Sequence, residues 1–145
     1  MEISNRKAYF EYSILQKYTA GIVLSGTEIK SIREGKVSFN DSFCIIFKGE
    51  LFLRSLHIAE YSHGGVYNHE PDRERKLLLR KPELKKIESK MKEKGYTIIP
   101  LKIFIASNGF AKVEIGLGKG KKSYDKRESI KTRETQREIK RKYGV

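Results

Sequence analysis

A run rich in glycine and lysine near residue 120 comes closest to a known chemical motif. Residues 116–123 read Gly-Leu-Gly-Lys-Gly-Lys-Lys-Ser. A nucleotide-binding P-loop needs G-x-x-x-x-G-K-[ST], but here Ile115 stands in the first glycine position and Lys122 follows Lys121. Glycines that alternate with lysines let backbone amides and ammonium groups approach a phosphate chain. The run therefore predicts contact with RNA, and a flexible exit from a strand is the alternative.

The three histidines of the chain are His57, His63 and His69, and their spacing does not suit a metal. A zinc site needs a closed set of ligands, and the sequence has no Cys pair and no His-x-x-x-His. We therefore expect no metal site. His69 lies in Asn-His-Glu-Pro, residues 68–71, where a loop histidine could stack on a base or contact a phosphate. A plain turn explains the same string equally well, so both interpretations stay open.

No set of side chains in the sequence is typical of catalysis. There is no G-x-S-x-G motif, and Cys44 lies in an apolar run, where a thiol behaves as a small hydrophobic group. Glu28 is the most tempting carboxylate, but Ser25-Gly-Thr-Glu28 matches a capping box, in which the glutamate binds the start of a helix. We therefore predict a protein that is not an enzyme, with no catalytic residue and no cofactor.

Basic residues interleaved with aromatic ones provide the positive signal. The string Asn5-Arg6-Lys7-Ala8-Tyr9-Phe10 places two cations beside two aromatic rings, and further basic clusters occupy residues 73–76 and 119–127. Cations bind phosphates by releasing counterions, and aromatic rings stack on unpaired bases. The clusters predict RNA binding, with a solvated charged surface as the alternative for any single one.

Composition points to the same kind of partner. The 145 residues include 31 Lys and Arg against 18 Asp and Glu, and the resulting charge of +13 attracts polyanions. No apolar stretch approaches the length of a membrane span, and the absence of Trp disfavours an interfacial helix. The first residues lack the apolar segment of a secretion signal, and a single cysteine allows no disulfide framework. We expect a cytoplasmic protein that binds no membrane.

The elements that would position these residues are mostly short strands. Apolar and aromatic residues from Tyr9 to Leu24 predict one long or bent strand, and the capping box then starts a helix that ends at Gly35. Two pairs of strands flank tight turns and predict hairpins: 43–47 with 51–58 around Lys48-Gly49, and 98–106 with 110–117 around Asn108-Gly109.

A second helix is predicted between the two hairpins. Pro82 suits a first helical turn, and Leu84, Ile87 and Met91 line one face. Pro100 suggests an edge position or a bulge in the next strand. Five or six short strands with two helices favour a small antiparallel barrel, mainly β with α, and we predict an OB-fold-like version of it.

The composition changes after residue 120. Residues 119–145 hold eleven Lys and Arg against four acids, which is +7 of the total charge. The few apolar side chains past Tyr124 cannot offset the entropy of ordering this segment. We therefore divide the chain into an RNA-binding body, residues 1–123, and a basic C-terminal tail, residues 124–145. The tail is expected to be disordered alone and able to become helical on an anionic surface.

The order of short strings along the chain resembles the SmpB family, the SsrA-binding proteins. Any one string is weak, but the ordered set is specific and covers nearly the whole length. The strings are NRKA at 5–8, AGIVL at 20–24, GTEIKS at 26–31, NDS at 40–42, NHEP at 68–71, RKLLL at 75–79, KGYT at 94–97, PLK at 100–102, GKGKK at 118–122 and DKR at 125–127.

The resemblance implies an OB-like barrel with flanking helices that makes and breaks no bond. It implies binding to the tRNA-like domain of tmRNA (the SsrA RNA), in place of the anticodon side of a tRNA. It also implies a role in trans-translation on stalled ribosomes, at the small-subunit decoding centre, with the tail helical on the ribosome and placed in the empty mRNA channel. Elongation factor Tu is an indirect partner through alanyl-tmRNA, and we expect a monomer.

Together these considerations predict two sets of contact residues. We expect one tmRNA-facing surface made of Asn5, Arg6, Lys7, Tyr9, Glu28, Lys30, His69, Arg75, Lys119, Lys121 and Lys122. We expect a ribosome-binding tail that uses Asp125, Lys126, Arg127, Lys131, Arg133, Arg137, Lys140 and Arg141. A structural ribosomal or initiation-factor-like OB protein is the alternative, and a nuclease is a more distant one because no acidic metal-binding cluster is found.

Overall fold

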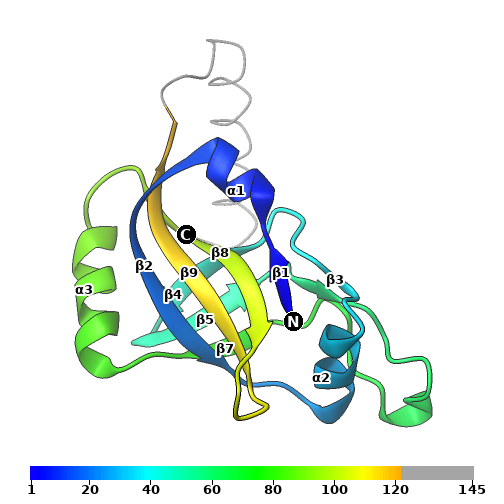
Figure 1. The fold of residues 1–145 in the computed structure, drawn as a ribbon. Coiled ribbons are helices and arrows are strands. Elements are labelled where there is room, and N and C mark those ends of the chain that lie inside the picture. The colour runs from blue at the N-terminus through cyan, green and yellow to red at the C-terminus, as the bar shows by residue number, and fades with distance from the viewer. Residues whose placement is uncertain (122–145) are drawn as a thin grey trace.

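The chain forms a closed antiparallel β-barrel, which the computed structural model describes for residues 1–121 (Figure 1). The predicted tail, 124–145, lies outside the described residues. The main sheet has the strand order β1-β8-β4-β5-β7-β2-β9, and pairing of β8 with β9 closes it, so the expected barrel is confirmed. The elements are β1 (Glu2–Ser4), α1 (Arg6–Glu11), β2 (Tyr12–Ile22), α2 (Gly26–Arg33), β3 (Val37–Ser38), β4 (Phe43–Phe47), β5 (Glu50–Arg54), β6 (His57–Ile58), the 3₁₀ turn η1 (Gly65–Tyr67), β7 (Arg75–Leu78), α3 (Lys81–Met91), β8 (Tyr96–Ile105) and β9 (Ala111–Gly120).

The start of the chain differs from the sequence prediction. The sequence predicts a strand from Tyr9, but α1 continues to Glu11 and β2 begins only at Tyr12. The helical turn buries Ala8 against Ile99 and Leu101 and leaves Tyr9 exposed. This tertiary contact outweighs the preference of the aromatic residues for a strand.

Helix α2 begins and ends as the sequence predicts. The Glu28 backbone N–H donates to the Ser25 hydroxyl at 3.4 Å, and the Ser25 N–H donates to the Glu28 carboxylate at 2.8 Å. Both halves of the capping box are therefore present. The helix ends at Arg33, and Gly35 follows with φ of +75°, a conformation that glycine adopts without strain.

The two predicted hairpins form around their predicted turns. Strands β4 and β5 flank Lys48-Gly49, and β8 and β9 flank Asn108-Gly109. The second strand of the first hairpin ends at Arg54 rather than at residue 58, because Ser55 takes a positive φ of 64° and turns the chain into the separate strand β6. The helix predicted after Pro82 is α3, with Ile87 fully buried.

Two register shifts bend the long strands. One lies between Pro100 and Lys102 in β8, where the sequence predicts an edge or a bulge. Proline has no N–H to donate, so a bulge accommodates it without losing a ladder bond. The other lies between Ile14 and Gln16 in β2, where no proline or glycine in the sequence indicates a bulge.

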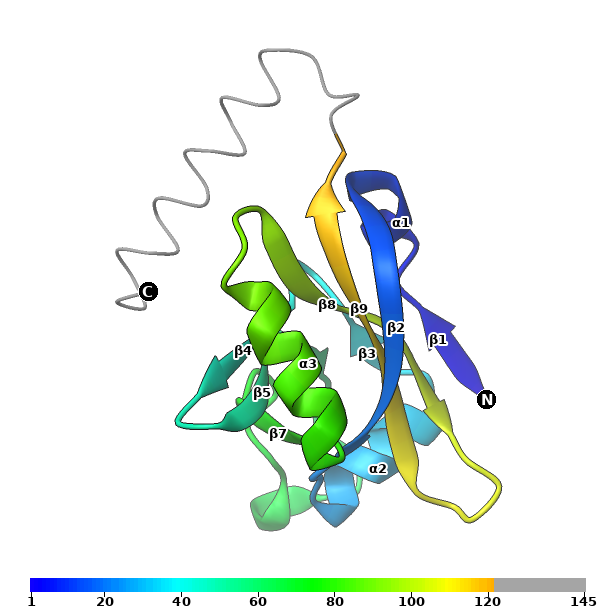
Figure 2. The same cartoon turned by 90° about the vertical axis from the view of Figure 1, so that its left-hand side faces the viewer.

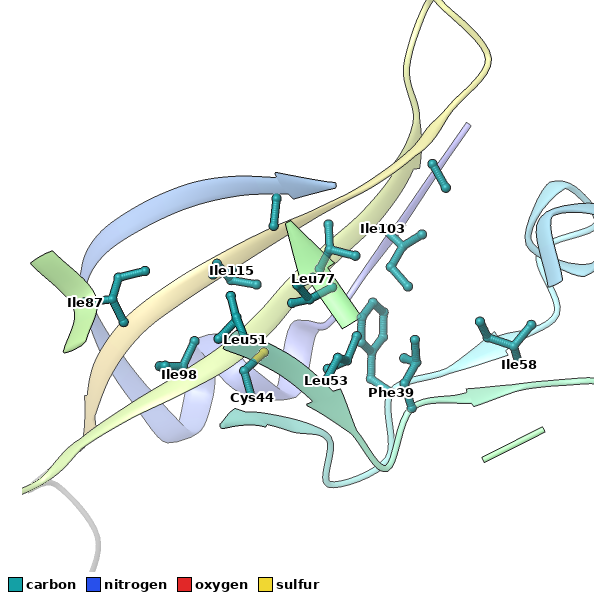
Figure 3. Close-up of a cluster of buried hydrophobic side chains, with 14 of the residues drawn as sticks. Phe39, Cys44, Leu51, Leu53, Ile58, Leu77, Ile87, Ile98, Ile103 and Ile115 are labelled. Carbon is teal, nitrogen blue, oxygen red and sulfur yellow. The ribbon is translucent and has the colours of Figure 1, made fainter. Parts of the chain in front are cut away.

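The hydrophobic core has two parts. The larger cluster fills the barrel, as Figure 3 shows for Leu51, Leu53, Leu77, Ile98 and Ile115. The smaller cluster consists of Ala8, Ile99 and Leu101, with Tyr12 and Ile14 packed against it, and it fixes α1 on the outside of the barrel.

Candidate nucleic-acid interface

Exposed cations and aromatic rings gather where β2 begins and β9 ends. The Lys121 backbone N–H donates to the Glu11 carbonyl at 2.9 Å, and Lys119 pairs in register with Ser13 of β2 and Tyr96 of β8. Helix α1 therefore sits beside the last residues of β9 (Figures 1 and 2). We call this region the α1 end, defined by Arg6, Lys7, Tyr9, Phe10, Tyr96, Lys119 and Lys121.

Most cations of the α1 end lack an acidic partner in the described part of the chain. Among residues 1–121, no carboxylate forms an ion pair with Arg6, Lys119 or Lys121. The Lys119 ammonium instead lies 4.5 Å from the centre of the Tyr96 ring. Unpaired ammonium groups beside an aromatic ring offer a phosphate and a base a place to bind together.

Lys7 is the exception in this region. Its ammonium contacts Asp41 at 3.1 Å and Glu11 at 3.6 Å. The hydrogen bond to Asp41, helped by the charge of Glu11, raises the pKa of Lys7. Binding a phosphate there requires these carboxylates to be displaced, so Lys7 is less available than Arg6.

Asn5 is buried and belongs to the framework of the α1 end. Its side-chain amide donates to the Pro100 carbonyl at 2.8 Å, and its backbone N–H donates to the Leu101 carbonyl at 2.7 Å. These two bonds join the start of α1 to the bulge in β8. In this structure Asn5 positions Arg6 and Tyr9 rather than facing a ligand.

The glycines of the Gly116–Gly120 run serve packing. A Cβ on Gly116 would lie 2.8 Å from Leu101 Cδ1, and a Cβ on Gly118 would lie 2.8 Å from the Ser13 carbonyl oxygen. Both positions face the smaller core cluster, where β2 and β8 press on β9. Gly120 has open space around it. Close strand packing is thus a third explanation for these glycines, beside phosphate approach and a flexible exit.

The other predicted contact residues lie around α2. The buried Glu28 carboxylate accepts from Arg73 Nη2 at 2.5 Å and from Arg75 Nε at 2.6 Å. Arg75 is fully buried, and its remaining nitrogens donate to backbone carbonyls: Nη1 to Leu56 at 2.5 Å and Nη2 to Pro71 at 2.9 Å. We call this region the α2 end, defined by Thr27, Glu28, Lys30, His69, Arg73 and Arg75.

The Glu28 network is held by charge. Burial disfavours the ionised form of Glu28, but hydrogen bonds from Arg73, the Ser25 N–H and Arg75 outweigh it, so the pKa of Glu28 lies below its ordinary value. Burial lowers the pKa of Arg75, which nevertheless keeps its proton because arginine titrates so far above neutrality. The pair is therefore an internal salt bridge, and neither Glu28 nor Arg75 is placed to touch RNA in this structure.

His69 is also buried and satisfied. Its Nε2 contacts the Ile58 carbonyl at 2.8 Å, and because a carbonyl only accepts, Nε2 carries the proton. Its Nδ1 is hydrogen-bonded to the Thr27 hydroxyl at 2.8 Å. The turn interpretation of residues 68–71 fits this arrangement, since His69 joins the loop to β6 and α2. Base stacking by His69 would require the loop to open.

Lys30 is the exposed cation of the α2 end among the predicted contact residues. Its ammonium lies 5.4 Å from the centre of the Tyr61 ring. The neighbouring basic cluster at residues 73–76 is instead paired with acids: Arg73 and Arg75 with Glu28, and Lys76 with Glu50.

The predicted residues therefore occupy two ends of the barrel. Helix α1 precedes β2 and α2 follows it, so the eleven-residue strand separates them by about 30 Å. Figures 1 and 2 show the two helices at opposite ends of the barrel. The structure does not bring the predicted residues together at one place on the described barrel, and a single RNA-facing surface made of all of them stays a prediction; Lys122 lies outside the described residues.

Comparison with known proteins places the chain in a family. The family model described as SmpB protein matches residues 2–144. The chain belongs to the SmpB family. Relatives named SsrA-binding protein include one from Fervidobacterium nodosum, 58% identical over 94% of this chain and 92% of its own length. Another from Bacteroides thetaiotaomicron is 52% identical over 99% of this chain and 95% of its own length.

A solved SmpB structure resembles the fold described above. It is reported as "tmRNA-SmpB: a journey to the center of the bacterial ribosome" and superposes with a TM-score of 0.72. It is 50% identical and covers 86% of this chain and 87% of its own. Within residues 1–121, no helix is long and apolar enough to cross a membrane, and no three potential metal ligands cluster.

Sequence reasoning missed two members of the SmpB α1 end, and it missed Thr27 and Arg73 at the α2 end. Phe10 is 76% exposed, and Tyr96 lies under Lys119. Both sit in strings noted from the sequence, but only strand register brings Tyr96 to α1. Arg73 belongs to a noted basic cluster, yet its pairing with Glu28 joins residues 45 positions apart, and no local pattern signals it.

Proposed function

We propose that this protein binds the tRNA-like domain of tmRNA and delivers it to stalled ribosomes in trans-translation. The observation that carries the proposal is the likeness to the solved tmRNA–SmpB structure, at 50% identity over 86% of the chain. The names of the SsrA-binding relatives support it independently.

The α1 end supplies suitable chemistry for this function. Arg6, Lys119 and Lys121 present cations that no described carboxylate neutralises, beside the exposed rings of Tyr9 and Phe10. Phosphates replace counterions at such cations, and unpaired bases stack on such rings. Lys30 with Tyr61 is a second, smaller pair of the same kind at the α2 end.

The protein acts by binding rather than by catalysis. Two groups with catalytic potential have structural roles: Glu28 is paired with two arginines, and Cys44 is buried. Burial raises the pKa of the Cys44 thiol, so it does not form the reactive thiolate near neutral pH. The Glu28 carboxylate remains ionised and paired with Arg73 and Arg75, which suits a structural role.

Further parts of the proposal concern the partners. The protein works as a cytoplasmic monomer, meets elongation factor Tu through alanyl-tmRNA, and places residues 124–145 in the empty mRNA channel near the decoding centre. Support comes from the charge of +7 over residues 119–145, which favours contact with ribosomal RNA.

The decisive experiment for the function is recovery of bound RNA. The protein is captured from a lysate of cells in which it is expressed, and the RNA that it retains is sequenced. Enrichment of tmRNA is expected. Enrichment of ribosomal RNA without tmRNA would contradict the proposal and favour a structural ribosomal OB protein.

The tail has its own prediction. A chain that ends after Asp125 keeps every described core residue, since the two clusters end at Leu117. It is expected to fold and to bind tmRNA nearly as the full chain does, but to fail in peptide tagging on stalled ribosomes. Normal tagging would refute the channel role, and a fall in tmRNA affinity would place the tail in the tmRNA site.

A further inference from the structure

A groove between α3 and β2 is not accounted for by the α1 or α2 end. It measures about 350 Å³ and is lined by Leu15, Gln16, Tyr18, Lys86, Ser89, Lys90 and Leu117. That volume lies at the lower limit of the roughly 300–1,000 Å³ typical of small-ligand sites. Figure 2 shows α3 running beside β2 and β9, the two strands that supply the other lining residues.

The groove is built by the bulge in β2. Successive residues of a regular strand point to opposite faces, so Leu15 and Gln16 could not both line one groove. The register shift between Ile14 and Gln16 inserts Leu15 as an extra residue. A bulge re-aims the side chains beside it, and here it turns two neighbours toward α3. Leu15 remains 54% exposed, so its apolar surface lacks a cover.

The wall formed by α3 is basic. Lys86 forms no ion pair with any carboxylate of residues 1–121. Lys90 contacts Glu93 at 3.5 Å, where both side chains are about half exposed, so the pair is weak. The Lys90 ammonium also lies 5.9 Å from the centre of the Tyr96 ring, the same ring that Lys119 covers. The groove therefore adjoins the α1 end through Tyr96.

We propose that this groove binds one unpaired nucleotide of the RNA that the protein carries. The base lies on the apolar surface of Leu15 and Tyr18, above the buried side chain of Leu117. Its phosphate lies against the Lys86 and Lys90 ammonium groups. The Gln16 amide and the Ser89 hydroxyl are the groups able to hydrogen-bond a base edge or a ribose. The proposal rests on the RNA-binding function above and adds a site to it.

Charge selects a nucleotide over the other possible occupants. The chain's own tail, residues 124–145, holds eight Lys and Arg against four acids, a net charge of +4, so the lysine wall repels it. A second copy of the chain, at +13, is disfavoured for the same reason. An apolar peptide would cover Leu15 but would leave Lys86 without a counter-charge. A nucleotide can cover the apolar surface of Leu15 with its base and give Lys86 a counter-charge with its phosphate.

The test is an NMR titration of the full chain. The probes are AMP and UMP, with inorganic phosphate and adenosine as separate controls. Weak binding by both nucleotides is expected, with shifts in the amides of Leu15, Gln16, Ser89 and Lys90. Inorganic phosphate alone should shift only the amide signals of the two lysines in the wall, Lys86 and Lys90. Equal shifts with phosphate and with AMP would overturn the base-binding part of the proposal.

Variants separate this site from the rest of the RNA surface. The double variant Lys86→Gln with Lys90→Gln should weaken AMP binding about fivefold or more, because it removes the charge-assisted hydrogen bonds to phosphate. Leu15→Ala should weaken AMP binding while leaving the response to phosphate unchanged. Lys48→Gln, at the β4–β5 turn and outside the groove lining, is the control and should change neither. Unaltered AMP affinity in all variants, or shifts confined to Lys119 and Lys121, would overturn the proposal.

The same variants are then compared in tmRNA binding. Failure of the unmodified protein to bind tmRNA would count against the proposed function itself. Normal tmRNA binding by the unmodified protein, with no AMP response at the groove, would count against the groove alone. Shifts at the groove that depend on protein concentration without ligand would show a second copy of the chain as its occupant and also overturn the proposal.

Discussion

The α1 end and the α2 end are built from similar residue types but use them in opposite ways. At the α1 end, Arg6 and Lys119 point to solvent without a described acidic partner. At the α2 end, Arg73 and Arg75 share one buried carboxylate, Glu28. A basic cluster in a sequence is therefore not evidence of a polyanion site until the nearby acids are known.

The difference follows from what each end must hold together. Arg75 donates to carbonyls of Leu56 and Pro71 as well as to Glu28, so it fixes the loop between β6 and β7 onto α2. Arginine suits this position because its planar guanidinium directs several donors at once. The α1 end is fixed by apolar packing under Ala8, which leaves its cations other than Lys7 available to bind a ligand.

The largest expected effect comes from removing the shared charge at the α2 end. Glu28→Gln keeps the size of the side chain but leaves Arg75 buried without a counter-charge. The free energy of unfolding should fall by about 3–5 kcal/mol, measured by urea denaturation. As a helix cap alone, Glu28 would contribute only about 1 kcal/mol.

The matched control lies at the end of the same helix. Glu34 forms an ion pair with Lys36, and both side chains are exposed. Glu34→Gln should cost less than about 1 kcal/mol. Similar, small decreases in the stability of the two variants would show that the buried network contributes nothing beyond the cap.

The second prediction uses pH to test the same network. The pKa of Glu28 is lowered by folding, so its contribution is complete above the unfolded value of about 4.3 and is lost as pH falls through the lower folded value. The difference in stability between the unmodified protein and Glu28→Gln should be constant from neutral pH to about pH 5 and shrink below about pH 4. A difference that persists in acid would mean that charge is not what holds the α2 end.

The third prediction concerns the packing under the α1 end. Gly118→Ala places a Cβ 2.8 Å from the Ser13 carbonyl, so the backbone of β2 must shift. We expect a decrease of about 1–3 kcal/mol in the free energy of unfolding. Gly120→Ala, two residues on and with open space around it, should stay within about 0.5 kcal/mol of the unmodified protein. Equal decreases would indicate a backbone effect of alanine rather than a steric one.

Local patterns predict much of the fold. The capping box at Ser25, the Asn108-Gly109 turn and the bulge near Pro100 depend on neighbouring residues and are confirmed. Helix α1 escapes local prediction because the packing of Ala8 on Leu101 joins residues far apart in sequence. The bulge at Leu15 escapes it because no residue type marks the position.

The candidate site is less predictable than the fold. Lys119 can be singled out from the sequence because glycines and lysines alternate around it, and Tyr9 because it closely follows Arg6 and Lys7. Arg75 and Arg6 each stand in a basic string of the sequence, yet the Arg75 side chain is buried and the Arg6 side chain is exposed. Only the position of Glu28, 47 residues away from Arg75, decides between these outcomes.

The smallest effect on stability, and the sharpest contrast with Glu28, is expected from the cations of the α1 end. Lys119→Gln with Lys121→Gln removes two charges that no described carboxylate neutralises. The free energy of unfolding should change by no more than about 0.5 kcal/mol, because neither ammonium holds another element in place. Binding to tmRNA should weaken, and the slope of log affinity against log salt should decrease by roughly 0.7–0.9 for each phosphate that the variant no longer neutralises. Lys48→Gln at the β4–β5 turn, which is not part of the α1 end, serves as the equal-charge control for each removal. If the slope falls by the same amount per charge in the control, tmRNA affinity depends only on the net charge of the protein. That result would contradict a specific role of the α1 end in binding tmRNA.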